Sequence, residues 1–110
     1  MIQVSNRNDW SIVTIDGELN SVNAPDADVR ISGALANSAN LIFDFSKLEY
    51  ISSAGLRSLL LGAKQIRERN GKMAIAGASE RIRKVFQLSG LIRHLNCFET
   101  LEEAEKFIQG

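Results

Sequence analysis

The sequence predicts an α/β domain built on one mixed β-sheet. Its 110 residues are the length of one domain, which we expect to span residues 1–110. Strand-like segments alternate with segments of helical periodicity in the order β-β-α-β-α-β-α-β-α, and this alternation is typical of sheets with parallel strand pairs. The first two strand-like segments follow each other directly, so they predict an antiparallel hairpin that makes the sheet mixed.

The predicted hairpin joins residues 2–4 to the segment "WSIVTIDG" (10–17) through the polar turn "SNRND" (5–9). Apolar residues alternate along both segments with the period of two that strands require. In the second strand, this alternation places two apolar pairs on opposite faces: Trp10 with Ile12, and Val13 with Ile15.

A helix is predicted next, because Pro25 suits a first helical turn and apolar residues then recur on one face. These residues are Ala27, Ile31, Ala34 and Leu35. The following segment "NLIFDF" (40–45) is a short, nearly continuous apolar run. Such a run predicts a central strand that is covered on both faces.

The clearest helical pattern runs from Ala54 to about Arg69, after a segment (46–53) that we expect to be a loop. Its apolar residues fall at helical spacing and predict a buried stripe: Leu56, Leu59, Leu60, Ala63 and Ile66. Gly62 lies beside the stripe, where the lack of a side chain lets the helix sit close to a sheet. Gly71 indicates the end of the helix.

The last third of the chain repeats the alternation. "KMAIAG" (72–77) predicts a strand, and the next helix is expected to be capped by Ser79 and ended by Gly90. Its predicted inner face consists of Ile82, Val85 and Phe86. Residues 91–98 contain a predicted short edge strand. Thr100 and Glu103 have capping-box spacing and predict the start of the last helix.

The composition excludes several classes of protein. Thirteen basic and thirteen acidic residues balance, so the strong positive charge of a nucleic-acid-binding domain is missing. No apolar stretch approaches the roughly 20 residues of a membrane span, and the N-terminus lacks the pattern of a signal peptide. Cys97 is the single cysteine, which suits a reducing compartment. We therefore predict a cytoplasmic protein without membrane insertion or direct nucleic-acid binding.

The adjacent Ser52 and Ser53, which precede the clearest helix, are the main candidates for a functional site. They could cap the helix, act as nucleophiles, or be substrates of another enzyme. From the residues alone we favour capping, because serine oxygens accept hydrogen bonds from the free N–H groups of a helix start.

Patterns for catalysis and ligand binding are missing around the two serines. A serine nucleophile needs a base, and the single histidine, His94, has no defined relation to Ser53. The segment contains neither a G-x-S-x-G motif nor a phosphate-binding glycine loop. Cys97 and His94 lack the second ligand pair of a zinc site. We predict no enzymatic activity, no catalytic residue, no metal site and no cofactor.

The segment "DFSKLEYISSAGLRSLL" (44–60) closely resembles the signature of the STAS domain family, which includes the bacterial anti-sigma factor antagonists. "IDGELN" (15–20) is similar to a G-E-L-D segment of that family, and "NGKMAIAGASERIRKVFQLSGL" (70–91) is similar to its later strand-helix stretch. The resemblance implies a STAS fold: a mixed sheet of four to five strands, with about four helices packed mainly on one side.

The resemblance also implies a regulated serine. Carried over by position, the phosphorylated residue is Ser53, with Ser52 as the less favoured acceptor, and Asp44, Ser46, Gly55 and Leu56 match the surrounding motif. Two positions depart from the family, because many members carry Asp where this chain has Asn20 and Ser52. We expect the partner to bind around this motif and on the exposed side of the helix. The expected contact residues are Asn20, Ser21, Ser46, Ser52, Ser53, Ala54, Gly55, Arg57 and Ser58.

The function that the resemblance implies is that of an anti-sigma factor antagonist. The unphosphorylated form would bind an anti-sigma factor that is also a serine kinase of histidine-kinase-like ATPase type, and would thereby free a sigma factor. Phosphorylation of Ser53 would end the binding, and a PP2C-type phosphatase would reverse it. The alternative is a STAS subunit of another assembly, such as a lipid-transport ABC system, in which phosphorylation has no role.

Overall fold

The chain forms seven strands, four α-helices and one 3₁₀-helix in the computed structural model, which describes residues 1–110. The elements are β1 (Ile2–Asn6), β2 (Ser11–Ile15), β3 (Gly17–Leu19), α1 (Ala24–Leu35), β4 (Leu41–Asp44), β5 (Leu48–Ile51), α2 (Ser53–Glu68), β6 (Met73–Ala76), α3 (Glu80–Leu88), η1 (Leu91–His94), β7 (Cys97–Phe98) and α4 (Leu101–Gln109).

Five of the strands form the predicted mixed sheet, in the order β1-β2-β4-β6-β7. β1 and β2 pair as an antiparallel hairpin, whereas the other neighbours in this sheet are parallel. β4 occupies the centre, as its continuous apolar sequence predicts. The pairing register aligns one apolar residue from each of three strands in a row: Val13, Phe43 and Ile75 on one face, and Ile12, Ile42 and Ala74 on the other.

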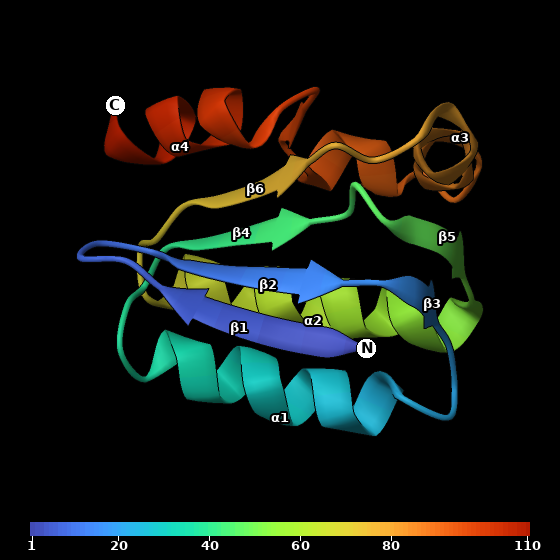
Figure 1. Ribbon diagram of the computed structural model, residues 1–110, viewed down its shortest axis with the longest axis horizontal. Helices are drawn as coiled ribbons and strands as arrows, with labels where there is room; N and C mark the ends of the chain where they lie inside the picture. The colour runs from blue at the N-terminus through green and yellow to red at the C-terminus, as the bar shows by residue number, and fades with distance from the viewer.

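The two faces of the sheet are covered unequally (Figure 1). The face with Phe43 packs against α1, α2 and α3 in a core of 22 buried residues. The opposite face packs against α4, whose Ala104 and Ile108 contribute to a cluster of seven. Three helices therefore share the larger core, and the predicted packing mainly on one side is confirmed. No helix combines the length and the apolar character that crossing a membrane would require.

The segment that we expected to be a loop between residues 46 and 53 contains a strand instead. β5 pairs in parallel with β3 in a separate two-stranded sheet, which buries Leu19 and Ile51. The Ser52 N–H extends this ladder by donating to the Leu19 carbonyl (2.9 Å). Both strands have fewer than five residues, and Glu49 and Tyr50 are consecutive exposed residues, so the sequence lacks the alternation that predicts a strand.

The buried face of α2 differs from the prediction at Leu56, Leu60 and Ser58. Leu56 is only partly buried. Leu60 is 44% exposed, although its spacing placed it in the buried stripe, and Ser58 is only 2% exposed, although we expected it on the outside. The reason is that α1 packs beside α2. A Cβ atom at Gly62 would lie 3.4 Å from Ile31 of α1, so the helices approach through small residues of α2. The resulting buried face consists of Gly55, Ser58, Leu59, Gly62, Ala63 and Ile66.

The predicted helix ends are confirmed. The Ser79 hydroxyl accepts from the Ile82 N–H (3.2 Å) at the start of α3, and Gly90 follows this helix with a φ of 79°. At the start of α4, Thr100 and Glu103 form both hydrogen bonds of a capping box.

Candidate functional site

Ser52 and Ser53 occupy different positions at the start of α2. Ser52 is the N-cap, in an extended conformation, and its hydroxyl accepts from the Gly55 N–H (3.3 Å). Ser53 is the first helical residue and is exposed, and its hydroxyl makes no hydrogen bond within the chain. The capping function therefore belongs to Ser52, and the Ser53 hydroxyl remains accessible.

Gly55 sets how closely α2 approaches the β3–β5 sheet. A Cβ atom at this position would lie 2.7 Å from both the Leu19 carbonyl oxygen and Cγ1 of Ile51. Such distances are too short for non-bonded atoms, so a side chain here would push the start of α2 away from the strands. Gly55 is buried beneath Leu19 and positions Ser52 and Ser53, so the free chain does not expose this predicted contact residue.

Asn20 organises the loop between β3 and α1. Its side-chain oxygen accepts from the N–H groups of Val22 (2.9 Å) and Asn23 (3.3 Å), and its amide nitrogen donates to the Glu18 carboxylate (3.0 Å). An aspartate could accept the first two bonds but could not donate the third. Asn20 thus orients Glu18 in a way that the family's aspartate would not.

The two departures from the family pattern lie next to each other. In the parallel pair, Glu18 is opposite Tyr50 and Leu19 is opposite Ile51, so Asn20 and Ser52 follow at the same level. Ser21 also belongs to this region, since it lines a groove of about 280 Å³ together with Ala54 and Arg57. The fold therefore brings together the loop after β3 and the first turns of α2.

Ser46 does not join this cluster. Its backbone N–H and its hydroxyl both donate to the Asp44 carboxylate, at 3.1 and 2.8 Å, where β4 ends. The four residues of β5 separate it from Ser52, and an extended strand of that length spans about 13 Å. The predicted site thus divides into a cluster around Ser53 and a separate turn at Ser46.

Ser58, another predicted contact residue, is covered in the free chain. It lines the bottom of the groove between α1 and α2 and is almost fully buried. A protein surface could reach Arg57, at the rim of the same groove, more easily than Ser58. Serine is typical of a surface position, but Ser58 is buried because α1 packs beside α2.

Exposed apolar side chains near Ser53 are functional candidates that the sequence reasoning missed. They are Val22 (87% exposed), Tyr50 (53%), Leu60 (44%) and Leu61 (45%). Leu60 follows Ser53 by seven residues, or two helical turns, and so lies on the same side of α2. The sequence contained a signal, since three consecutive leucines at 59–61 cannot all face one core.

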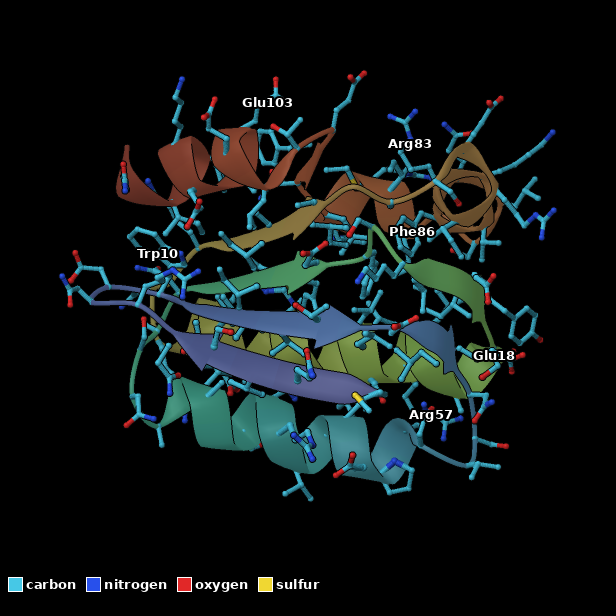
Figure 2. The ribbon with its side chains drawn as sticks, viewed as in Figure 1. Trp10, Glu18, Arg57, Arg83, Phe86 and Glu103 are labelled. Carbon is cyan, nitrogen blue, oxygen red and sulfur yellow. The ribbon has the colours of Figure 1, made fainter.

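Charged side chains of both signs lie near the start of α2. Glu18 is an exposed carboxylate on β3, and Arg57 is exposed one turn after Ser53. Figure 2 shows Glu18 and Arg57 at the same end of the molecule. Arg57 takes part in neither of the two salt bridges of the chain, so its guanidinium remains available to a partner.

The site lacks the arrangement that a nucleophilic serine needs. His94 lies on η1 and lines a different pocket, beside Ala63 of α2. Ala63 is ten residues from Ser53, which corresponds to about 15 Å along a helix. The chain also has no group of three side chains suited to hold a metal ion. The Ser53 hydroxyl therefore has neither the histidine nor a metal site beside it.

Cys97 is a half-buried thiol on β7. Burial raises its pKa, and the nearby Arg83 guanidinium opposes that rise. A raised pKa keeps the thiol protonated at neutral pH, which lowers its reactivity.

Comparison with known proteins identifies a domain family and relatives that are named as anti-sigma factor antagonists. The model of the STAS domain matches residues 1–104. BtrV of Bordetella bronchiseptica, which carries the name of an anti-sigma factor antagonist, is 34% identical over 82 residues, covering 74% of this chain and 71% of BtrV. The anti-sigma-F factor antagonist RsfB of Mycobacterium tuberculosis is 26% identical, covering 99% of this chain and 89% of RsfB.

Solved structures share the fold over nearly the whole chain. The structure of tm1081 from Thermotoga maritima matches with a TM-score of 0.92 and 22% identity, covering 99% of this chain and 95% of that one. The anti-sigma factor antagonist SpoIIAA matches in its unphosphorylated form (TM-score 0.80, 22% identity, 100% and 99% coverage). It also matches in its phosphorylated form, from Bacillus (TM-score 0.78, 24% identity, 98% and 99% coverage).

Proposed function

The chain belongs to the STAS domain family, and from this membership we propose that it is an anti-sigma factor antagonist switched by phosphorylation of Ser53. The observation that best supports the proposal is that the two serines have different roles at the start of α2. Ser52 caps α2, whereas Ser53 exposes an unbonded hydroxyl, so modification of Ser53 removes no native hydrogen bond. Relatives named as anti-sigma factor antagonists support the same function.

The proposed partner is an anti-sigma factor that is also a serine kinase of histidine-kinase-like ATPase type. The unphosphorylated chain binds it and frees a sigma factor, and a PP2C-type phosphatase restores the binding form. Because sigma factors act on transcription inside the cell, we place this function in the cytoplasm.

The partner docks on the exposed and partly buried residues around Ser53, which we call the Ser53 surface: Asn20, Ser21, Val22, Tyr50, Ser52, Ser53, Ala54, Arg57 and Leu60. Exposed apolar side chains that cluster beside charged ones are typical of interaction sites. Val22 lies in the turn between β3 and α1, Tyr50 on β5 and Leu60 on α2. A phosphate on Ser53 would therefore lie within the contact area.

Phosphorylation adds about −1.5 to −2 charges at neutral pH. A helix start accommodates that charge, because the first N–H groups lack helical acceptors and the dipole favours anions. The exposed carboxylate of Glu18 lies at the same end of the molecule (Figure 2). The added charge thus opposes a partner through repulsion and desolvation while the fold persists. The match to both states of SpoIIAA supports this view.

The test captures the partner from the native host with tagged wild-type protein and then adds ATP and Mg²⁺ to the complex. We expect mass spectrometry to identify a serine kinase, a phosphate on Ser53 of the wild type, and release of the phosphorylated protein. The Ser53→Ala variant should bind and stay bound after ATP is added.

Ser52→Gly is the matched control, because Gly is tolerated at an N-cap with a loss of only a few tenths of a kcal/mol. It should still be phosphorylated and released. Phosphorylation of Ser53→Ala but not of Ser52→Gly would move the acceptor to Ser52. Capture of the same partner by phosphorylated and unphosphorylated protein would instead favour the alternative of a structural STAS subunit.

A further inference from the structure

A second concave site lies at the opposite end of α2 from Ser53. Its volume is about 230 Å³, and it is lined by the last turns of α2, the residues that lead into β6, η1 and α4. Four separate parts of the chain thus converge on one cavity, which the proposed antagonist function does not use.

Basic side chains from three of these parts line the cavity: Arg67 of α2, Lys72 before β6, and His94 of η1. No Asp or Glu is among the lining residues, and neither Arg67 nor Lys72 forms a salt bridge. Lys72 is held in place, since its ammonium donates to the Phe107 carbonyl (3.2 Å) and lies 5.4 Å from the centre of the Phe107 ring. An ammonium has three donors, so two remain for a ligand.

The end of α2 would normally disfavour an anion, because its carbonyl groups carry partial negative charge. Here carbonyl groups in the last turn of α2 already accept hydrogen bonds. The Ile66 carbonyl accepts from the N–H groups of Arg69 and Gly71, and the Arg69 guanidinium donates to the Gln65 carbonyl (3.2 Å). The basic side chains therefore dominate the local field.

Four of the other six lining residues are apolar, namely Ala63, Ile66, Met73 and Phe107, and the remaining two are Gly71 and Asn96. The cavity is smaller than the roughly 300–1,000 Å³ of sites for drug-sized ligands. Its lining thus suits a small molecule with one anionic group and one compact apolar group.

We propose that this cavity, formed by Arg67, Lys72 and His94 over an apolar floor, binds a small organic monoanion such as an aromatic carboxylate. The site is separate from Ser53, so the proposal stands or falls independently of the antagonist function.

The test is an NMR titration of the isotope-labelled full chain with three probes: benzoate, benzyl alcohol and inorganic phosphate. Benzyl alcohol keeps the ring without the charge, and phosphate keeps the charge without the ring. We expect saturable benzoate shifts at the amides of Gly71, His94 and Asn96, with at least about fivefold weaker binding of either other probe, as for loss of one charge-assisted contact or of one apolar group.

Arg67→Gln should weaken benzoate binding by about threefold, as expected for one partly exposed charge. Arg81→Gln is the control, because Arg81 is also an exposed arginine, lies on α3 and does not line the cavity. A thermal melt confirms that both variants fold.

Each contrary result overturns the proposal. Benzoate shifts that fail to saturate or that lie outside the cavity would exclude the site. Equal affinity for benzyl alcohol would remove the role of the basic residues, and equal affinity for phosphate would remove that of the apolar floor. An equal loss in Arg67→Gln and Arg81→Gln would show a general charge effect.

Discussion

The two faces of α2 differ in almost every physical property although they belong to the same sixteen residues. The inner face carries small and aliphatic residues, with Gly55, Leu59 and Gly62 buried against β5, the sheet and α1. The outer face carries Ser53, Arg57, Leu60, Leu61 and Lys64, all exposed. Stability thus depends on one face, whereas the proposed switch uses the other.

A single helix can therefore use one side for folding and the other side for recognition, according to where each residue lies around the helix axis. Residues at positions 59 and 60 are both leucine, yet Leu59 is fully buried and Leu60 is 44% exposed. The same substitution at the two positions should therefore change the free energy of unfolding by different amounts.

The largest effect is expected for Leu59→Ala. Removing a fully buried leucine side chain leaves a cavity and should lower the free energy of unfolding by about 2–5 kcal/mol. Urea denaturation measures the loss, with Leu60→Ala as the matched control on the outer face. Equal losses for the two variants would contradict the division of α2 into two faces.

Gly55→Ala should come next, at about 1–3 kcal/mol, because the added methyl group meets the Leu19 carbonyl and the Ile51 side chain. Gly33→Ala in α1 is the matched control. A Cβ atom at Gly33 meets nothing within 4 Å, so this change should stabilise the helix by about 0.5–1 kcal/mol. Thermal melting of both variants distinguishes close packing from helix propensity, and a stable Gly55→Ala protein would refute the tight contact.

Leu60→Ser tests the outer face. It should reduce binding of the captured partner by about 1–2 kcal/mol, as for an apolar contact at the centre of an interface, while stability changes by less than about 0.5 kcal/mol. Binding assays and denaturation of the same preparation give both numbers. Unchanged affinity would place the interface elsewhere than on the Ser53 surface.

Arg57→Glu should weaken partner binding as well, with a change in stability below about 1 kcal/mol because the side chain is exposed. Glu103→Lys lies far from Ser53 and should leave binding nearly unchanged, although it breaks the capping box of α4. Glu102→Lys is the cleaner control, since Glu102 is exposed on the same helix and outside that box. Similar losses of affinity for all three would indicate a long-range charge effect instead of a contact.

The smallest expected effect is a loss of stability at high pH, and it should not depend on which face of α2 is altered. The Cys97 thiol, on β7, keeps its proton to higher pH in the folded state than in the unfolded state, because burial raises its pKa. Above the ordinary value of 9.0, the unfolded chain releases this proton more readily, so stability should fall as pH rises. Wild type and Leu60→Ser should show the same fall, and Cys97→Ala should reduce it.

Much of the fold follows from local pattern. The periodicity of apolar residues determined the hairpin, the central β4, and the existence and approximate ends of all four helices. Serine and threonine at the helix starts determined the caps of α3 and α4, because capping involves residues close in the chain. Resemblance to a family then indicated Ser53, which local chemistry alone could not distinguish from Ser52.

Only tertiary structure decided the details around the site. β3 and β5 are too short to be recognised alone, and they exist because each supplies the other's hydrogen bonds across about thirty residues of chain. Their pairing buries Gly55, separates Ser46 from Ser53 and places Asn20 beside Ser52. The packing of α1 against Gly62 rotates Leu60 outward and Ser58 inward. Helical spacing specifies which residues share a side of α2, but the neighbouring elements select which side is covered, and that choice determines which residues a partner can reach.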